Sequence, residues 1–213
     1  MRQDVERAIL SVALAYLLGA IPFSLVAGKL TRGIDLRQHG SGNLGAANTF
    51  RTLGPVPGVV VLLLDAGKGA AAVGAAALLW RDSVGLGRTD LMLLCGLAAV
   101  AGHIWTVFAS FRGGKGVATA AGVFAAIAPQ AFGICLAVWV ITVAVSRYVS
   151  LGSILAATCL PATVYLTAAG GKGDWKKVFC VAVVVAVLVV ARHGGNISRI
   201  LRGQERKFRL HGG

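Results

Sequence analysis

Acidic residues are scarce in this chain of 213 residues, which has 8 Asp and Glu against 21 Lys and Arg and a formal net charge of +13. Charged residues of both signs make up only 14% of the chain, whereas soluble domains carry about 25%. So few charges leave too little polar surface to cover the apolar bulk of a soluble protein. This argues against a soluble nucleic-acid binder despite the basic balance, and we expect no nucleic-acid partner.

Cysteine is also scarce, and the four cysteines are scattered. Cys95, Cys135, Cys159 and Cys180 each lie within an apolar run, and no two of them form a C-x-x-C pair. This pattern indicates neither a disulfide framework nor a zinc site, and it is typical of small buried side chains. We expect neither a bound metal nor a cofactor.

Hydrophobic residues, in contrast, make up 56% of the chain, and the mean hydropathy is +0.77. This composition excludes intrinsic disorder and indicates an all-α, polytopic membrane protein. The apolar runs predict seven transmembrane helices in a single integral membrane domain. Their expected ranges are 8–28, 57–80, 91–111, 117–128, 130–146, 151–169 and 178–191. The fourth range is much shorter than the roughly 20 residues that a helix needs to cross a bilayer.

The basic residues set the expected orientation. Those that follow the first, third, fifth and seventh spans would share one side of the membrane. They are Lys29, Arg32, Arg37, Arg51, Arg112, Lys115, Arg147, Arg192, Arg199, Arg202, Arg206, Lys207 and Arg209. By the positive-inside rule this side is cytoplasmic, so the N-terminus lies outside and the C-terminus in the cytoplasm.

The first polar segment with possible chemistry runs over 39–51 and contains G-x-G-x-x-G at Gly40, Gly42 and Gly45. A dinucleotide fingerprint would also need a preceding strand, which this chain does not offer. Glycines still permit a backbone that aims N–H groups at a phosphate. The side-chain donors of the segment are Ser41, Asn43, Asn48 and Arg51. The alternative is a flexible polar loop between two helices.

The second segment follows His103 and contains Gly113, Gly114 and Lys115 just before an apolar run. Glycines and a lysine at a helix start are typical of an anion site. The spacing is not that of a Walker A motif, since Ala109 and Gly116 occupy its required Gly and Ser/Thr positions. His103 itself is either part of the site or a polar contact between helices.

Two further groups of polar residues follow the fifth and seventh spans. Ser150 and Ser153 could bind a ligand or cap the next helix. His193 and Asn196 are three residues apart and would share one face of a helix. Together with the glycine-rich segments they predict a phosphate-binding surface at the cytoplasmic face, where chemistry depends on positioning and electrostatic stabilisation.

Asp65 and Lys68 lie near the middle of the second predicted span. Charges inside a membrane are costly and often functional. Their i, i+3 spacing also allows a mutually neutralising pair, and we favour that structural interpretation.

The segments 41–48, 113–119 and 147–153, with Arg51, His103 and the His193/Asn196 pair, resemble the bacterial acyl-phosphate:glycerol-3-phosphate acyltransferases, the PlsY family. The resemblance covers nearly the whole chain. It implies a seven-helix inner-membrane enzyme with its active site facing the cytoplasm. Such an enzyme transfers an acyl group from acyl-phosphate to the 1-hydroxyl of glycerol 3-phosphate, giving lysophosphatidic acid and phosphate in the first step of phospholipid synthesis. No cofactor is implied, and we favour a monomer in contact with membrane lipids.

The resemblance also implies roles for individual residues. Glycerol 3-phosphate would be held by Arg51, Lys115, Ser150, His193 and Asn196. The acyl-phosphate site would be lined by Ser41, Gly42, Asn43, Gly45, Asn48, Gly113 and Gly114, with His103 and Ser153 as further candidates. The chain departs from the family pattern at Ala47, where a Thr is usual, and at Thr106, where a Pro is frequent.

Two other classes of function fit part of the pattern. A transporter for a phosphorylated solute would use the same basic surface, and charges such as Asp65 and Lys68 are typical of transport paths. The short length of this chain, the lack of an inverted repeat and the position of the polar groups at one face argue against a transporter. A membrane anchor with a basic tail would not explain the glycine-rich segments.

Overall fold

The computed structural model of the chain describes residues 2–81, 86–168 and 173–208. Across these ranges every regular element is a helix, which confirms the all-α prediction. The end of the sixth predicted span at Ala169 and the basic residue Arg209 lie outside the described residues. The chain divides into two compact units, Met1–Ile127 and Ala128–Gly213, and each is described by itself.

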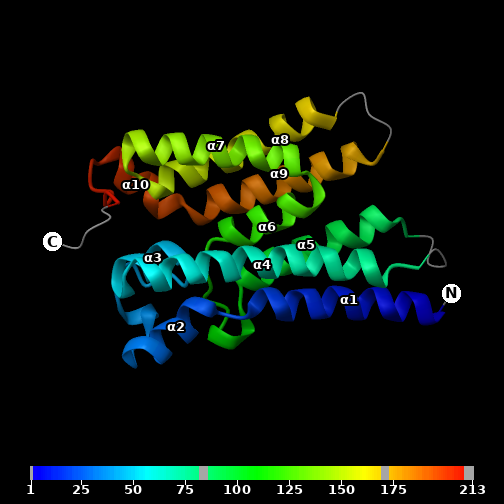
Figure 1. The fold of residues 1–213 in the computed structure, drawn as a ribbon, viewed down its shortest axis with the longest axis horizontal. Helices are drawn as coiled ribbons and strands as arrows, with labels where there is room; N and C mark the ends of the chain where they lie inside the picture. Colours follow the sequence, from blue (N-terminus) through cyan, green and yellow to red (C-terminus); the bar gives the residue numbers. More distant parts are fainter. Residues whose placement is uncertain (1, 82–85, 169–172, 209–213) are drawn as a thin grey trace. The chain divides into compact units, whose positions relative to one another are not determined.

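Three long helices run side by side in the first unit, and shorter elements complete it (Figure 1). The long ones are α1 (Arg2–Ala20), α4 (Pro55–Leu79) and α5 (Arg88–Ile104). The shorter ones are α2 (Phe23–Arg32), η1 (Leu36–Gln38), α3 (Ala46–Leu53), η2 (Val107–Ala109) and α6 (Val117–Ile127). Helix α6 packs on α4, while α2 and α3 lie at the end of the unit opposite the N-terminus (Figure 1).

The first predicted span is broken before Pro22, so that it forms α1 and α2 instead of one helix. Proline has no N–H and cannot continue the hydrogen bonds of a helix. At the break, the carbonyl of Ala20 accepts a hydrogen bond from the Thr106 hydroxyl, and that of Ile21 accepts one from Lys68 Nζ at 2.9 Å. Such partners are needed because the membrane interior offers no water to a backbone carbonyl.

Five helical segments are long and apolar enough to cross a membrane. They are Asp4–Arg32, Pro55–Leu79, Arg88–Ala109, Pro129–Ser146 and Val149–Ala168. The fourth predicted span corresponds to α6, whose 11 residues reach only about 16 Å at 1.5 Å per residue. The described part of the chain thus supports five spans, or six if a bent helix pair in the second unit is counted as one span, and seven crossings stay a prediction.

The second unit consists of three helices packed side by side and a short fourth helix (Figure 1). These are α7 (Pro129–Ser146), α8 (Val149–Ala168), α9 (Trp175–Arg192) and α10 (Gly194–Leu201). The chain bends by 57° between α9 and α10, which form the bent pair. All four cysteines of the chain are free.

Glycines allow the helices of the first unit to approach closely. A Cβ at Gly19 on α1 would overlap the backbone of Ala99 on α5, and a Cβ at Gly69 on α4 would overlap the carbonyl oxygen of Thr119 on α6. Small residues at such contacts are typical of membrane helices, where close backbone packing replaces the hydrophobic effect. The contact between α4 and α6 fixes the helix that follows the second glycine-rich segment.

Gly69→Ala is expected to destabilise the protein, because the new methyl group overlaps the backbone of α6. Overpacking of this kind costs about 1–3 kcal/mol. Gly74→Ala on the same helix is the matched control, since a Cβ there meets no atom within 4 Å. Thermal unfolding in detergent should give a lower midpoint for the first variant alone, and equal midpoints would contradict the close α4–α6 contact.

Candidate active site

Two glycines shape the first glycine-rich segment, which leads from η1 into α3. Gly40 and Gly42 have φ angles of 65° and 70°, in the region that side chains disfavour. A Cβ at Gly40 would also overlap the Asn48 side-chain oxygen. The backbone can therefore make its tight turn only with glycine at these positions.

Asn48 holds this segment in place from its buried side. Its side chain is buried, its Oδ1 accepts a hydrogen bond from Ser41 N at 2.8 Å, and its Nδ2 donates to the carbonyls of Leu36 at 3.2 Å and His39 at 3.1 Å. Both amide hydrogens are thereby engaged by the protein. The structure thus gives Asn48 a positioning role, and the sequence pattern alone did not distinguish this from direct substrate contact.

Helix α3 begins directly after the segment, with Gly45 at the N-cap. No side chain caps this end, and the first N–H groups of any helix have no partner within it. The helix dipole also favours a negative charge at this point. Ser41 is exposed before the helix and Arg51 is exposed on it, so both side chains can reach an anion from solvent.

The second glycine-rich segment folds back on the end of α5. Gly113 N donates to the Ile104 carbonyl and Gly114 N to the His103 carbonyl, both at 3.0 Å. Gly116 then leads into α6, and the half-buried Lys115 lies between these anchored residues and the helix start. The lysine is consequently held close to the N-terminus of α6.

The two segments meet although they are far apart in the sequence. A Cβ at Gly114 would come within 2.8 Å of the Leu44 carbonyl oxygen, so this carbonyl lies directly against the glycine. Each of these residues precedes a helix start by a few positions. The first unit therefore brings together two helix starts, two glycine-rich backbones and Lys115, which is an arrangement suited to phosphate.

The polar residues of the second unit gather around Glu205. Ser150 Oγ and Asn196 Nδ2 donate to its Oε1 at 2.7 and 2.6 Å, and Arg199 Nε donates to its Oε2 at 2.9 Å. The side chain of Glu205 is only 7% exposed. This carboxylate thus fixes the orientation of two predicted site residues, Ser150 and Asn196.

His193 lies at the bend between α9 and α10 and is buried. Its Nδ1 lies 2.8 Å from the Val189 carbonyl, which can only accept, so this contact places a proton on Nδ1. Ser153 also has a structural setting, since its hydroxyl accepts from Trp139 Nε1 at 3.3 Å and donates to the Val149 carbonyl at 2.9 Å.

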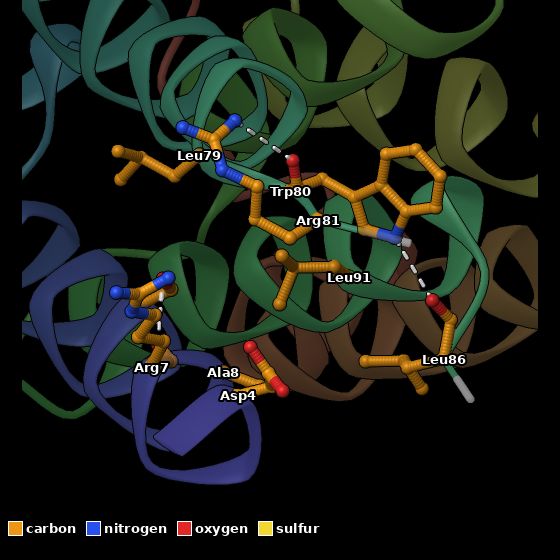
Figure 2. A pocket seen from close by; sticks show the side chains of 9 residues that line it. Asp4, Arg7, Ala8, Leu79, Trp80, Arg81, Leu86 and Leu91 are labelled. Atoms are coloured by element: carbon orange, nitrogen blue, oxygen red, sulfur yellow. Dashed lines mark hydrogen bonds between the residues drawn. The ribbon is translucent and has the colours of Figure 1, made fainter. Parts of the chain in front are cut away.

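A hollow at the opposite end of the first unit lies apart from the glycine-rich segments. Asp4 and Arg7 of α1 line it together with Trp80 and Arg81 at the end of α4 (Figure 2). Trp80 Nε1 donates to the Leu86 carbonyl at 2.9 Å, which closes one wall (Figure 2). In the described residues no group of three or more His, Cys, Asp or Glu side chains is placed to hold a metal ion, in this hollow or elsewhere.

Comparisons with known proteins agree on one family. A family model described as glycerol-3-phosphate acyltransferase matches residues 9–203. This chain belongs to the glycerol-3-phosphate acyltransferase family, the PlsY family. The glycerol-3-phosphate acyltransferase of Trichlorobacter lovleyi is 45% identical to it, over 93% of this chain and 96% of that protein. The corresponding protein of Chlorobium phaeobacteroides strain DSM 266 is 42% identical, over 93% and 95%.

The fold is similar to that of a solved structure from the same family. The crystal structure of PlsY (YgiH), an integral membrane glycerol 3-phosphate acyltransferase in its glycerol 3-phosphate form, has a TM-score of 0.84 and 39% identity to this chain. The similarity covers 95% of this chain and 96% of that one. The resemblance inferred from the motifs is thus confirmed, the chain is an acyltransferase and an integral membrane protein, and the transporter and anchor alternatives lose their support.

Glu205 orients two of the predicted site residues, and the sequence pattern did not reveal this. It stands in the basic tail that follows α10. Its sole distinguishing signal is that it is an isolated acid among Arg199, Arg202, Arg206 and Lys207. Of the two roles considered for Ser150, a helix cap is not what the structure shows, because Ser150 is the second residue of α8 and its hydroxyl donates to this carboxylate.

Glu205 is expected to make stability depend on pH. Burial alone would raise its pKa, but the hydrogen bonds from Ser150, Asn196 and Arg199 hold the pKa below the ordinary value of 4.5. A carboxylate with a lowered pKa stabilises the fold fully above the unfolded-state pKa, and this contribution is lost as the pH falls through the folded-state value. Glu205→Gln should therefore lower stability by on the order of 2 kcal/mol at neutral pH.

The measurement is thermal unfolding in detergent between pH 3 and 7. The difference between wild type and Glu205→Gln should be largest near neutrality. It should shrink below about pH 4.5, where the carboxylate of the unfolded chain begins to take up a proton, and be lost as the pH falls through the lower folded-state pKa. A difference that is the same at every pH would mean that the charge of Glu205 is not what holds the C-terminal segment.

Proposed function

We propose that this acyltransferase moves an acyl group from acyl-phosphate to the 1-hydroxyl of glycerol 3-phosphate and releases lysophosphatidic acid and phosphate, the first step of bacterial phospholipid synthesis. The observation that carries the proposal is the meeting of the two glycine-rich segments at Leu44 and Gly114, beside two helix starts. Backbone N–H groups in such a place favour a phosphate group. The similarity to PlsY in a glycerol 3-phosphate form and in a lysophosphatidic acid form supports both substrate and product.

In the proposed step the 1-hydroxyl oxygen attacks the acyl carbon, and the bond between that carbon and the phosphate oxygen breaks. The hydroxyl proton passes to the leaving phosphate, which is anionic and adjacent, so no protein base is required. The protein contributes positioning and stabilisation of negative charge. A pH–rate profile that depends strictly on His103 or His193 as a base would contradict this route.

Residue roles follow the family resemblance and remain proposals. Acyl-phosphate is assigned to the glycine-rich segments, namely Ser41, Gly42, Asn43, Gly45, Gly113 and Gly114, with Asn48 supporting them. Glycerol 3-phosphate is assigned to Arg51, Lys115, Ser150, His193 and Asn196. The position of Lys115 beside Gly114 supports a role at both phosphates.

The proposed setting is the bacterial inner membrane, with seven crossings if the short helix α6 also spans, a cytoplasmic active site and a monomeric enzyme. The excess of Lys and Arg on the connections assigned to the cytoplasm supports this orientation. Part of that charge also suits contact with anionic lipid headgroups.

Lys115→Ala is expected to abolish phosphate release from acyl-phosphate and glycerol 3-phosphate while the protein still folds. Loss of one positioned charge that stabilises a transition state costs on the order of a hundredfold to a thousandfold in rate. Lys176→Ala is the matched control, because Lys176 is exposed near the start of α9 and beside Trp175. Robust turnover by Lys115→Ala with an unchanged unfolding midpoint would refute the site assignment.

The orientation can be tested with introduced cysteines and a membrane-impermeant thiol reagent. A cysteine replacing the exposed Val5 should react in intact cells, whereas one replacing the exposed Arg202 should react only after the membrane is opened. The unmodified protein measures the background from its own four cysteines. The reverse pattern would invert the topology, and labelling of both positions in intact cells would require an even number of crossings.

A further inference from the structure

An ion pair lies within the membrane-spanning part of the first unit, where the proposed function assigns no role. Lys68 Nζ is 2.8 Å from Asp65 Oδ1 on α4, and each side chain is only 2% exposed. The pair that the i, i+3 spacing predicted is thus present. A buried pair is costly unless further contacts engage both groups, so its other contacts indicate its use.

The lysine of the pair serves the break in the first span. Lys68 Nζ donates to the Ile21 carbonyl at 2.9 Å, and the ammonium lies 5.5 Å from the centre of the Phe23 ring. These contacts satisfy the backbone at the break and stabilise the charge. These contacts give Lys68 a structural role. The carboxylate of Asp65 has a second neighbour besides Lys68.

That neighbour is His103 near the end of α5. Its Nδ1 faces the same Oδ1 of Asp65 at 3.5 Å, which is an ion-pair contact longer than an ordinary hydrogen bond, and the residue is 6% exposed. The opposite edge of the ring faces the second glycine-rich segment, because a Cβ at Gly114 would overlap His103 Nε2. The His103 carbonyl also accepts the hydrogen bond from Gly114 N at 3.0 Å. His103 therefore contacts this glycine with both its backbone and its ring.

We propose that Asp65 is a positioning residue for the phosphate-binding segment: its carboxylate orients the His103 ring, and the ring fixes Gly114 and hence Lys115. This inference rests on the proposed function for the identity of the ligand. Asp65 itself touches no substrate. The ion pair is then more than mutual neutralisation, because one of its members holds the helix break and the other holds the segment that binds phosphate.

Two double variants separate positioning from simple charge compensation. Asp65→Leu with Lys68→Met removes both charges, so no unpaired charge stays buried, and it also removes the acceptor for His103. Asp65→Asn with Lys68→Met removes the same charges but keeps an acceptor oxygen near Nδ1. If Asp65 orients His103, the first variant should be impaired and the second should be largely rescued.

The readouts are the KM for acyl-phosphate and the affinity for inorganic phosphate, the latter needing no turnover. The Leu/Met variant should show a tenfold or greater loss in both, of the order expected when a binding group is displaced by about 1 Å. The Asn/Met variant should stay within a few-fold of wild type. Equal values for the two variants, or wild-type values for the Leu/Met variant, would overturn the proposal.

A measurement on the unaltered protein keeps the test decisive if the Leu/Met variant does not fold. In protein labelled with ¹⁵N-histidine, His103 should carry a proton on Nδ1, because this nitrogen faces the Asp65 carboxylate. Its resonance is assigned by replacing the other three histidines in turn. An unprotonated Nδ1 would overturn the proposal. If wild type binds phosphate but does not turn over acyl-phosphate, the proposed function fails, while the phosphate affinities and the ¹⁵N spectrum still decide the role of Asp65.

Discussion

The ion pair between Asp65 and Lys68 joins three parts of the first unit that are distant in sequence. Lys68 contacts the broken first span at Ile21, and Asp65 contacts His103. The ring of His103 in turn packs against the second glycine-rich segment. Neither partner can be lost alone without leaving a charge in an apolar surrounding. The helix break and the candidate phosphate site are therefore constrained by the same buried charges, although each has a separate local cause in Pro22 and in the glycines.

Close backbone approach is the second constraint, and it follows from the membrane setting. Helices in lipid gain little from burying apolar side chains, so their packing depends on short distances between backbones. Gly19 provides such a distance between α1 and α5, Gly69 provides one between α4 and α6, and Gly113 and Gly114 provide them where the chain folds back on α5. Glycine thus serves helix packing in the middle of the unit and backbone exposure to an anion at its end.

The sequence was sufficient for the features that depend on local pattern. Apolar runs located α4, α7, α8 and α9 to within a few residues, and the i, i+3 spacing predicted the Asp65–Lys68 pair, but the predicted bounds of α1 and the predicted end of α5 were wrong by six to eight residues. The sequence was insufficient for features that depend on how separate segments meet. Examples are the inward orientation of the Asn48 side chain and the contact between the Leu44 carbonyl and Gly114. The apolar run also placed the end of the third span at residue 111, whereas α5 stops at Ile104. Phe108 and Phe111 are apolar but lie after α5, in η2 and in the turn that follows it.

The scarcity of acidic residues is consistent with a site for phosphorylated substrates, and so is the placement of the acids that remain. A carboxylate beside a phosphate would repel it, since two like charges at 4 Å cost about 4 kcal/mol near a protein surface. In the first unit Asp65 lies behind His103, and in the second unit Glu205 accepts hydrogen bonds from Ser150 and Asn196. Asp65 is paired with Lys68 and Glu205 with Arg199, so each of these carboxylates is compensated by a cation within its own unit.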